Sequence, residues 1–320
     1  MNPGRGKQAR YSPARVTVAV LTYVPNQVGY FQGRFAVMRA CLESIIKHTE
    51  MPYDLMVFDN GSCPEVVSYL NGLHKAGKIR FLILSGENIG KIGALKMIFN
   101  AAPGEIVAYS DDDIFFLPGW LKKHLEVLDT YPKTGAVTGM YIKPHMKEGI
   151  RSTLSFSQNK DVYVEKGNLI AKDLEQHYID QTGRTEERYR DEIQGIEDCR
   201  LTYRDVTTFV SAGHYQFAAP RKVILDALPL TWSGNLMGQM RDLDVAIDNL
   251  GYLRLCITPE VIKLLGNLID ERAAAVIKEF GIQIEAEQIY LPGDTGLLKI
   301  PVVKKLAYFL YERLFRIINA

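Results

Sequence analysis

GEIVAYSDDDIFFLPGWL, residues 104–121, is the stretch that decides the fold. Its first part, EIVAYS at 105–110, is a short apolar run that predicts a buried strand. Three aspartates follow directly, and Pro118-Gly119-Trp120 then precedes a helical period. Because adjacent like charges repel and a buried carboxylate is costly, the cluster is either a solvated turn or a site that holds a cation.

Strands and helices alternate on both sides of this stretch. Short apolar runs predict strands at 16–23, 53–62 and 79–84, in addition to 105–110. Helical spacing of apolar residues predicts helices at 35–46, 64–75, 92–99 and 121–128. This alternation favours right-handed βαβ units, so we expect an α/β fold with a mostly parallel central sheet flanked by helices.

The pattern changes after residue 144. Residues 173–205 carry ten acidic and five basic side chains with little periodicity, which suggests a solvated insertion or a mobile lid. VTTFVSA and YQFAAP, between 206 and 220, are predicted to be paired strands, and 240–257 a helix followed by a strand. We therefore divide the chain into a basic tail (1–15), a first half (16–145), a second half with the charged insertion (146–265) and a C-terminal helical extension (266–320).

The composition is that of an ordinary globular protein. With 47% hydrophobic and 23% charged residues, 320 residues can bury a large core. Lys+Arg 38 and Asp+Glu 37 give a net charge of +1, so we expect no nucleic-acid partner. The four cysteines lack disulfide-framework or zinc spacing, which favours free thiols in a reducing cytoplasm. We identify neither a secretory signal nor an apolar run of membrane-spanning length.

Polar residues follow three of the predicted strands. Thr22-Tyr23, Asp59 to Ser62 and Asp111 to Asp113 each stand where a strand ends. The carboxyl ends of parallel strands meet at one edge of a sheet, and ligands of α/β proteins bind at that edge. We therefore expect three turns from separate parts of the chain to form one site.

Four segments occur in the order and spacing of a known family: VAVLTY, VFDNGS, ENIGKIGALKMIF and YSDDDIFFLPGWL. They resemble the family 2 glycosyltransferases of the GT-A fold, well over 16–145 and more weakly over 206–260. The resemblance implies a GT-A-like, Rossmann-like domain with a nucleotide-half and an acceptor-half. It also implies a nucleotide-diphosphate sugar donor, and sugar transfer to an acceptor hydroxyl with inversion.

The resemblance implies base-recognition roles at two strand ends. Tyr23 would lie against the nucleotide base with Thr22 beside it, and Asp59 would accept the imide N–H of uracil or thymine, which favours UDP or dTDP. Each residue has a plainer alternative. Tyr23 could simply pack on the sheet, and Asp59 could form an Asx turn at the end of its strand.

The diphosphate would lie near the start of the helix at 92–99. Asn88 and Gly90 match the family's Asn-x-Gly, which brings the backbone close to the diphosphate, and Lys91 could contact phosphate. The alternatives are a tight turn that caps the helix and an ordinary surface lysine.

The aspartates would hold a divalent cation. Carboxylate oxygens suit Mg²⁺ or Mn²⁺, which use few protein ligands besides substrate phosphate. The cluster looks like the family's Asp-x-Asp motif, so Asp111 would contact ribose or metal and Asp113 the metal, while Asp112 could replace either. Because no histidine occurs after His214, aspartates, diphosphate and water would be the main ligands.

Inverting transfer also requires a base that takes the proton of the attacking hydroxyl. The family places a Glu-Asp pair at the start of a late helix, and RDLDVAIDNLGY is the matching run. Asp242 then corresponds to the base, with a helix N-cap as its alternative role, and Arg241 replaces the Glu. Arg241 could help to hold a phosphate or an acidic acceptor. Asp198 is the reserve base if Glu197-Asp198 lies on a closing lid.

PVVKKLAYFLYERLFRIINA, at 301–320, combines an apolar stripe with lysines and arginines. It would lie either in the interface of the inner membrane face or against the protein or a second subunit. We expect a cytoplasmic protein that makes peripheral membrane contact or a homo-oligomer through this helix. The acceptor would be a glycan, a lipid-linked molecule or a small molecule.

These patterns together predict a metal-dependent glycosyltransferase. One alternative is a non-catalytic nucleotide-sugar-binding module, which the replacement at Arg241 would allow. The other is a sugar nucleotidyltransferase, but LTYVPNQVGY lacks the basic residues expected after the first strand of such an enzyme.

Overall fold

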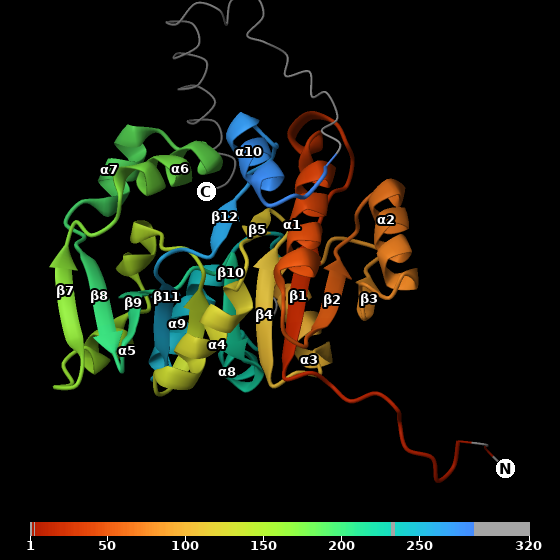
Figure 1. Ribbon diagram of the computed structural model, residues 1–320, viewed down its shortest axis with the longest axis horizontal. Coiled ribbons are helices and arrows are strands. Elements are labelled where there is room, and N and C mark those ends of the chain that lie inside the picture. The colour runs from red at the N-terminus through yellow and green to blue at the C-terminus, as the bar shows by residue number, and fades with distance from the viewer. Residues whose placement is uncertain (1, 3, 232–233, 285–320) are drawn as a thin grey trace, which may run out of the picture. The chain divides into compact units, whose positions relative to one another are not determined.

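The computed structural model describes residues 2, 4–231 and 234–284, and Figure 1 shows their arrangement. Within these residues one sheet has the strand order β3-β2-β1-β4-β10-β6-β11-β9-β8-β7. Its strands are β1 (Val16–Thr22), β2 (Asp54–Asp59), β3 (Phe81–Leu84), β4 (Ile106–Asp111), β6 (Thr134–Thr138), β7 (Tyr163–Gly167), β8 (Asp198–Tyr203), β9 (Val206–Val210), β10 (Gln216–Pro220) and β11 (Leu253–Ile257). β5 (Ile114–Phe116) and β12 (Ile262–Leu264) form a separate antiparallel pair.

The first half of the sheet is parallel, as predicted. β1 pairs in parallel with β2 and β4, and β2 pairs in parallel with β3. β6 and β11 are also parallel, whereas β10 runs antiparallel to both of its neighbours. The strands β9, β8 and β7 extend the sheet with antiparallel pairs.

Helices cover both faces of the sheet because the side chains of its buried strands alternate between two cores (Figure 1). Val18 and Val20 belong to the core beneath α1, α2 and α4, whereas Ala19 belongs to the core beneath α3, α8 and α9. The helices are α1 (Arg34–His48), α2 (Pro64–Lys75), α3 (Gly90–Ala101), α4 (Trp120–Thr130), α5 (Arg151–Phe156), α6 (Lys172–Thr182), α7 (Glu186–Ile193), α8 (Arg221–Ala227), α9 (Met240–Asn249) and α10 (Glu271–Glu279), with short 3-10 turns η1 (Gly29–Phe31) and η2 (Lys143–Lys147). The predicted α/β fold with a helix-flanked sheet is confirmed.

The predicted pairing of the two strands between 206 and 220 is wrong. β9 pairs with β8 and β11, whereas β10 lies between β4 and β6. The apolar pattern identified both segments as strands, but strand partners depend on the path of the connecting loop. That loop carries the chain from β9 past β11 and β6 to β10, rather than closing a hairpin.

The charged segment 173–205 has a regular structure. It forms α6, α7 and β8, and Tyr178, Ile179 and Tyr189 are buried against the larger core. Its acidic and basic side chains therefore belong largely to two helices whose apolar side chains are packed against the core. The described residues up to Ile284 belong to one compact unit, and the predicted boundaries inside it stay predictions.

The predicted C-terminal helix at 301–320 lies outside the described residues. Among the helices of the described part, none is long and apolar enough to cross a bilayer.

Candidate functional site

The carboxyl ends of β1, β2 and β4 meet at one edge of the sheet. β1 lies between the other two, with Thr22 paired to Asp59 and Leu21 paired to Asp111. The main-chain N–H of Tyr23 donates to Asp112 Oδ2 at 3.3 Å and so ties the end of β1 to the loop after β4. The three polar strand ends form one region, as expected from their position after parallel strands.

A cavity of about 390 Å³ opens at this edge. Its walls come from these strand ends, η1, the start of α3 and the loop before α9. Several predicted site residues line it: Tyr23, Asn88, Lys91, Asp111, Asp112 and Asp113. Asn60, which lies in the predicted turn after β2, also lines it, whereas Tyr30, Phe31 and Arg34 were not predicted.

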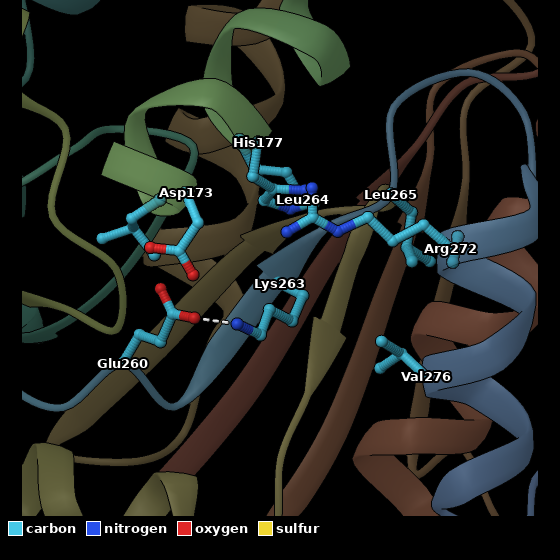
Figure 2. A pocket seen from close by; sticks show the side chains of 10 residues that line it. Asp173, His177, Glu260, Lys263, Leu264, Leu265, Arg272 and Val276 are labelled. Atoms are coloured by element: carbon cyan, nitrogen blue, oxygen red, sulfur yellow. Dashed lines mark hydrogen bonds and ion pairs between the residues drawn. The ribbon is translucent and has the colours of Figure 1, made fainter. Parts of the chain in front are cut away.

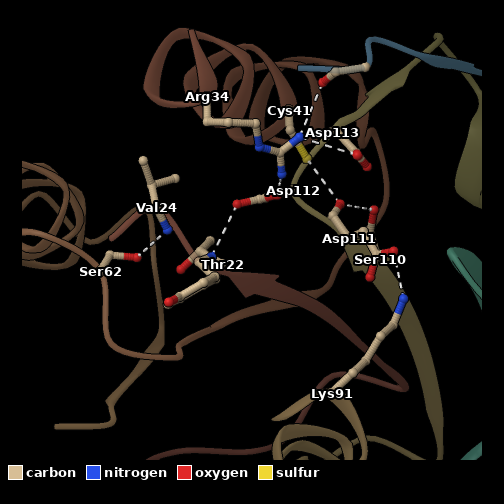
Figure 3. Close-up of polar contacts among 12 residues, drawn as sticks. Thr22, Val24, Arg34, Cys41, Ser62, Lys91, Ser110, Asp111, Asp112 and Asp113 are labelled. Atoms are coloured by element: carbon tan, nitrogen blue, oxygen red, sulfur yellow. Dashed lines mark hydrogen bonds and ion pairs between the residues drawn. The ribbon is translucent and has the colours of Figure 1, made fainter. Parts of the chain in front are cut away.

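The three consecutive aspartates have different environments. The side chain of Asp112 is 4% exposed, whereas that of Asp113 is 31% and that of Asp111 25% exposed. Arg34 of α1 pairs with Asp112 and, at 3.2 Å, with Asp113, while Lys91 of α3 donates to Asp111 Oδ2 at 2.6 Å from the opposite side (Figure 3). The cluster is therefore not a solvated turn, because two cations of the chain itself compensate its charge.

Burial makes two of these carboxyls hard to ionise. It raises the pKa of Asp112 to about 7, although Arg34 acts in the opposite direction. Burial likewise raises the pKa of Asp113, again against the effect of Arg34. Any further cation near them would favour the ionised forms.

Asp111 and Asp113 are the groups in this cavity that suit a divalent cation. Within the described part of the chain, no three His, Cys, Asp or Glu side chains are grouped as metal ligands. The two partly exposed carboxylates do supply hard oxygen donors, and Mg²⁺ commonly binds through one or two carboxylates plus substrate phosphates. The donor set fits an ion held mainly by a bound diphosphate.

Asp59 is buried and already hydrogen-bonded. Its Oδ1 accepts from the Thr22 hydroxyl at 3.1 Å, and its Oδ2 accepts from the main-chain N–H of Ser62 at 3.1 Å. The bond to Ser62 spans three residues, so it closes a turn one residue longer than the Asx turn that was the alternative to base recognition. Tyr23 does line the cavity, with its ring edge-on to Phe31 at 5.8 Å between centroids.

The turn before α3 is closed by side-chain amides. Asn60 Oδ1 accepts from the main-chain N–H of Ile89 at 2.9 Å, and Asn88 Oδ1 accepts from that of Gly90 at 2.8 Å. The N–H of Lys91 donates to the Leu236 carbonyl at 3.0 Å. Because all three N–H groups have acceptors within the chain, the Lys91 ammonium is the group in this turn best able to meet a diphosphate.

Gly90 is required at this turn. Its φ is +72°, and a Cβ there would lie 2.5 Å from the Asn235 carbonyl oxygen. Only glycine adopts this conformation and permits this approach without strain.

Asp242 lies exposed in the first turn of α9, where Gln239, not Asp242, is the N-cap residue. Neighbouring Arg241 is 79% exposed, with its Nη1 3.7 Å from Glu148 Oε1. Asp244 takes the inward position instead, and sequence reasoning missed it. The missed signal was the buried stripe of α9, since Asp244 is four positions from buried Met240.

Asp244 belongs to a buried polar cluster beside a second cavity, of about 240 Å³. Its Oδ2 lies 2.8 Å from His214 Nδ1, and its Oδ1 lies 2.8 Å from Arg254 Nη2. Burial raises the pKa of Asp244, but Arg254 and then His214 outweigh that effect, and the net shift is downward. An ionised Asp244 accepts the Nδ1 proton of His214 and leaves Nε2 as the acceptor nitrogen.

Asp198, the reserve base, is fully buried at the start of β8. It accepts from the Tyr141 hydroxyl at 3.1 Å and the Leu169 N–H at 2.8 Å, and its Oδ1 lies 3.4 Å from Lys143 Nζ. These contacts join β8 to the segments on either side, which is a structural role.

A third cavity, of about 160 Å³, lies between α6, β12 and α10 (Figure 2). Glu260 pairs with Lys263 there, and burial followed by the charge of Arg272 lowers the pKa of His177. It shares no lining residue with the cavity at the aspartates, so it is not part of the candidate site.

One known protein is similar to part of this chain. The Bacillus subtilis (strain 168) protein described as uncharacterized glycosyltransferase YwdF is 26% identical over 116 residues, which are 36% of this chain and 39% of that protein. The chain therefore spans well under half of that relative's length.

Two solved structures are also similar. The mannosyltransferase PcManGT from Pyrobaculum calidifontis, in complex with GDP-Man and Mn²⁺, has a TM-score of 0.45 at 19% identity, covering 78% of this chain and 56% of that one. S. aureus TarS 1-349 has a TM-score of 0.46 at 13% identity, covering 78% of this chain and 59% of that one.

The family comparison is the decisive one. The model described as Glycosyl transferase family 2 matches residues 31–206, which include α1, the aspartates and the turn before α3. Since this match covers more than half of the chain, the protein belongs to glycosyl transferase family 2.

Proposed function

We propose that the protein transfers a sugar from a nucleotide-diphosphate sugar, UDP or dTDP favoured, to an acceptor hydroxyl with inversion. The observation that carries this proposal is the cavity of about 390 Å³ at the ends of β1, β2 and β4. Its lining combines aromatic Tyr23 and Phe31 with Lys91 and the aspartates. A nucleotide needs this combination, because its base is flat and apolar while its diphosphate is anionic.

Different residues would contact different parts of the donor. The Tyr23 ring would pack against the base, and the Lys91 ammonium would meet the diphosphate after leaving Asp111. Asp111 would then be free for ribose or a metal, and Asp113 would hold the metal. When bound, Mg²⁺ or Mn²⁺ would neutralise charge on the leaving diphosphate. Recognition of a uracil or thymine by Asp59 requires that it keep accepting from Thr22 and Ser62 while it accepts the imide N–H.

For the base we propose His214, held by Asp244, in preference to Asp242. The Asp244 carboxylate fixes the imidazole so that Nε2 can take the hydroxyl proton. His214 also lines the second cavity, and the carbonyl of the next residue, Tyr215, accepts from the main-chain N–H of Asp111 at 2.8 Å. Asp242 lines none of the three cavities described above. His214→Gln should lower kcat at least about 100-fold while donor binding persists. A comparable loss in Asp242→Asn with an active His214→Gln variant would return the role to Asp242.

Calorimetric titration with UDP and with GDP, each with and without Mn²⁺, tests the donor site. We expect UDP binding that Mn²⁺ strengthens and that Asp113→Ala weakens. Asp129→Ala is the matched control, because it also removes the carboxylate partner of an arginine, Arg15 at 2.5 Å, but on the exposed surface. If neither nucleotide binds the wild type, the donor site is refuted; if GDP binds better, the role of Asp59 is refuted.

Donor hydrolysis then separates a transferase from a non-catalytic binding module. A competent enzyme releases sugar slowly to water, and His214→Gln should abolish that release. Tight UDP binding without any hydrolysis or transfer would identify a binding module instead.

A further inference from the structure

Arg34 is a buried arginine in direct contact with the aspartate cluster. It is the first residue of α1, and its guanidinium contacts both Asp112 and Asp113 (Figure 3). Its Nη1 lies 3.2 Å from Asp113 Oδ2 and also donates to the Gly266 carbonyl at 3.1 Å. Two carboxylates and a carbonyl from the segment after β12 therefore hold the guanidinium in place.

Two of these contacts do not involve Asp113. The pair with Asp112 is buried, and separating such a pair is costly because each charge would lose its compensation. Asp112 is fixed as well, since its Oδ2 accepts from the main-chain N–H of Tyr23 at 3.3 Å. The Gly266 carbonyl supplies the second anchor. We therefore expect Arg34 to keep its place when a donor binds.

Lys91, the other cation in contact with the aspartates, differs from Arg34 in this respect. Its ammonium donates to Asp111 Oδ2 at 2.6 Å from the end of a flexible four-carbon stem, so it can move to a phosphate. The Arg34 guanidinium is planar and donates to several acceptors at once. Its charge therefore stays in contact with Asp113, the carboxylate for which we propose a metal.

This charge opposes a second cation on Asp113. An arginine next to an aspartate lowers the affinity of that carboxylate for a proton by roughly 10- to 1000-fold. A divalent cation carries twice the charge of a proton, so Arg34 should lower the affinity of Asp113 for it at least as much. A diphosphate is anionic, and its charge would offset the repulsion.

We propose that Arg34 prevents the free protein from binding a divalent cation at Asp113, so that the metal enters together with the diphosphate of the donor. The proposal rests on the proposed function, in which Asp113 holds the metal. It adds an order of binding and assigns that order to one residue. Arg34 exerts this effect through Asp113, with which it is in contact.

The test is a titration of the full chain with Mn²⁺ alone at pH 8, in which the electron paramagnetic resonance signal measures free Mn²⁺. The decisive comparison is between Asp112→Asn, which keeps Arg34 on Asp113, and the double variant Arg34→Met/Asp112→Asn, which removes both charges of the buried pair. The double variant should bind Mn²⁺ at least about tenfold more tightly than Asp112→Asn. Adding Asp113→Ala to the double variant should remove this gain.

Two measurements accompany this comparison. Arg15→Met is the matched control, because it removes an arginine from an exposed pair with Asp129, and it should bind Mn²⁺ like the wild type. The wild type should bind Mn²⁺ at least about tenfold more tightly in the presence of UDP than without it, because the diphosphate offsets the charge of Arg34. This second measurement needs no variant, so it tests the order of binding even if a substitution prevents folding.

The proposal is overturned if the double variant binds Mn²⁺ no more tightly than Asp112→Asn, if the gain survives Asp113→Ala, or if the wild type binds Mn²⁺ equally well with and without UDP. Mn²⁺-strengthened UDP binding in the wild type, without any gain in the double variant, would leave the donor site intact and refute the role of Arg34 alone. Absence of Mn²⁺ binding in every variant, with and without UDP, would refute the metal role of Asp113 and this proposal with it.

Discussion

Arg34→Met is the substitution that most directly tests how the aspartate cluster is held. Arg34 pairs with Asp112 and Asp113, and its Nη1 donates to the Gly266 carbonyl at 3.1 Å. Methionine keeps much of the apolar stem but removes the charge and both sets of hydrogen bonds. The variant leaves Asp112 in a buried position without its cation.

The expected loss of unfolding free energy follows from the burial of the Arg34–Asp112 pair. The side chains of Arg34 and Asp112 are 10% and 4% exposed, so the pair counts as buried. Removing one partner of a buried pair costs about 3–5 kcal/mol of unfolding free energy, because the other charge loses its compensation. Arg15→Met is the matched control: Arg15 and Asp129 are both about half exposed, and loss of such a pair costs at most about 1 kcal/mol.

The assay is equilibrium denaturation at pH 8, with a double-mutant cycle. Arg34→Met combined with Asp112→Asn should recover at least about 2 kcal/mol relative to the sum of the single changes, because no uncompensated charge remains. The reasoning is refuted if Arg34→Met costs no more than Arg15→Met, or if the two single changes simply add.

The raised pKa of Asp112 determines the direction in which stability changes with pH. The pKa of Asp112 is raised to about 7, above its value of about 4 in an unfolded chain, so the folded state binds the extra proton between these values. This group therefore makes the protein more stable as pH falls from about 7 towards about 4. Loss of Arg34 raises the pKa of Asp112 further, so the folded variant gives up this proton at a higher pH than the folded wild type does. The difference in unfolding free energy between Arg34→Met and the wild type should therefore widen as pH rises from 6 to 9, by at most about 1.4 kcal/mol per pH unit.

Three further predictions concern single positions. Gly90→Ala should lower the free energy of unfolding by about 1–3 kcal/mol and weaken UDP binding, because the new Cβ would meet the Asn235 carbonyl at a positive φ. Unchanged melting and titration curves would contradict this. Asp198→Asn should cost about 3–5 kcal/mol in denaturation, because Lys143 loses its buried partner, and a stable but inactive variant would restore Asp198 as the base. Burial lowers the pKa of His124 to about 4, so on acidification the unfolded chain binds this proton before the folded protein does. The free energy of unfolding therefore falls as pH falls from about 6.5 to about 4, and in His124→Gln, measured by acid denaturation, it should depend less on pH.

The first half of the fold could largely be predicted from sequence. Apolar runs and helical periods predicted the elements of 16–145, and parallel strands must place their carboxyl ends on one edge. Three polar turns were therefore known to meet there without any coordinates. The order of motifs then led to the family that the family model confirms.

The charges around the aspartates could not be predicted. Arg34 lies far from the cluster in sequence, and nothing in the pattern of α1 marks it as a partner; only the packing of α1 against β5 brings it there. Three identical neighbours also conceal which carboxylate turns inward. The turn between β4 and β5 decides this, since it holds both Asp112 and Asp113 and buries only Asp112 beside Arg34.

In the second half of the chain, too, the sequence predicted an element but not the contacts of its side chains. Two positions along a helix differ by about 200°, so Asp242 and Asp244 lie on opposite faces of α9. The family motif pointed to Asp242, whereas the buried stripe of Met240, Leu243 and Ile247 turns Asp244 towards His214. Local pattern alone does not say what a buried face will meet.

The sequence by itself determined the α/β class, the convergence of three polar strand ends at one sheet edge, and the family, because these depend on local periodicity, on motif order and on rules that all parallel sheets obey. The tertiary structure alone decided the antiparallel insertion of β10, the cations that compensate the aspartates, and the pairing of Asp244 with His214 and Arg254. Each of these joins residues far apart in the chain. Such contacts depend on how packed elements are placed in space, which no local pattern encodes.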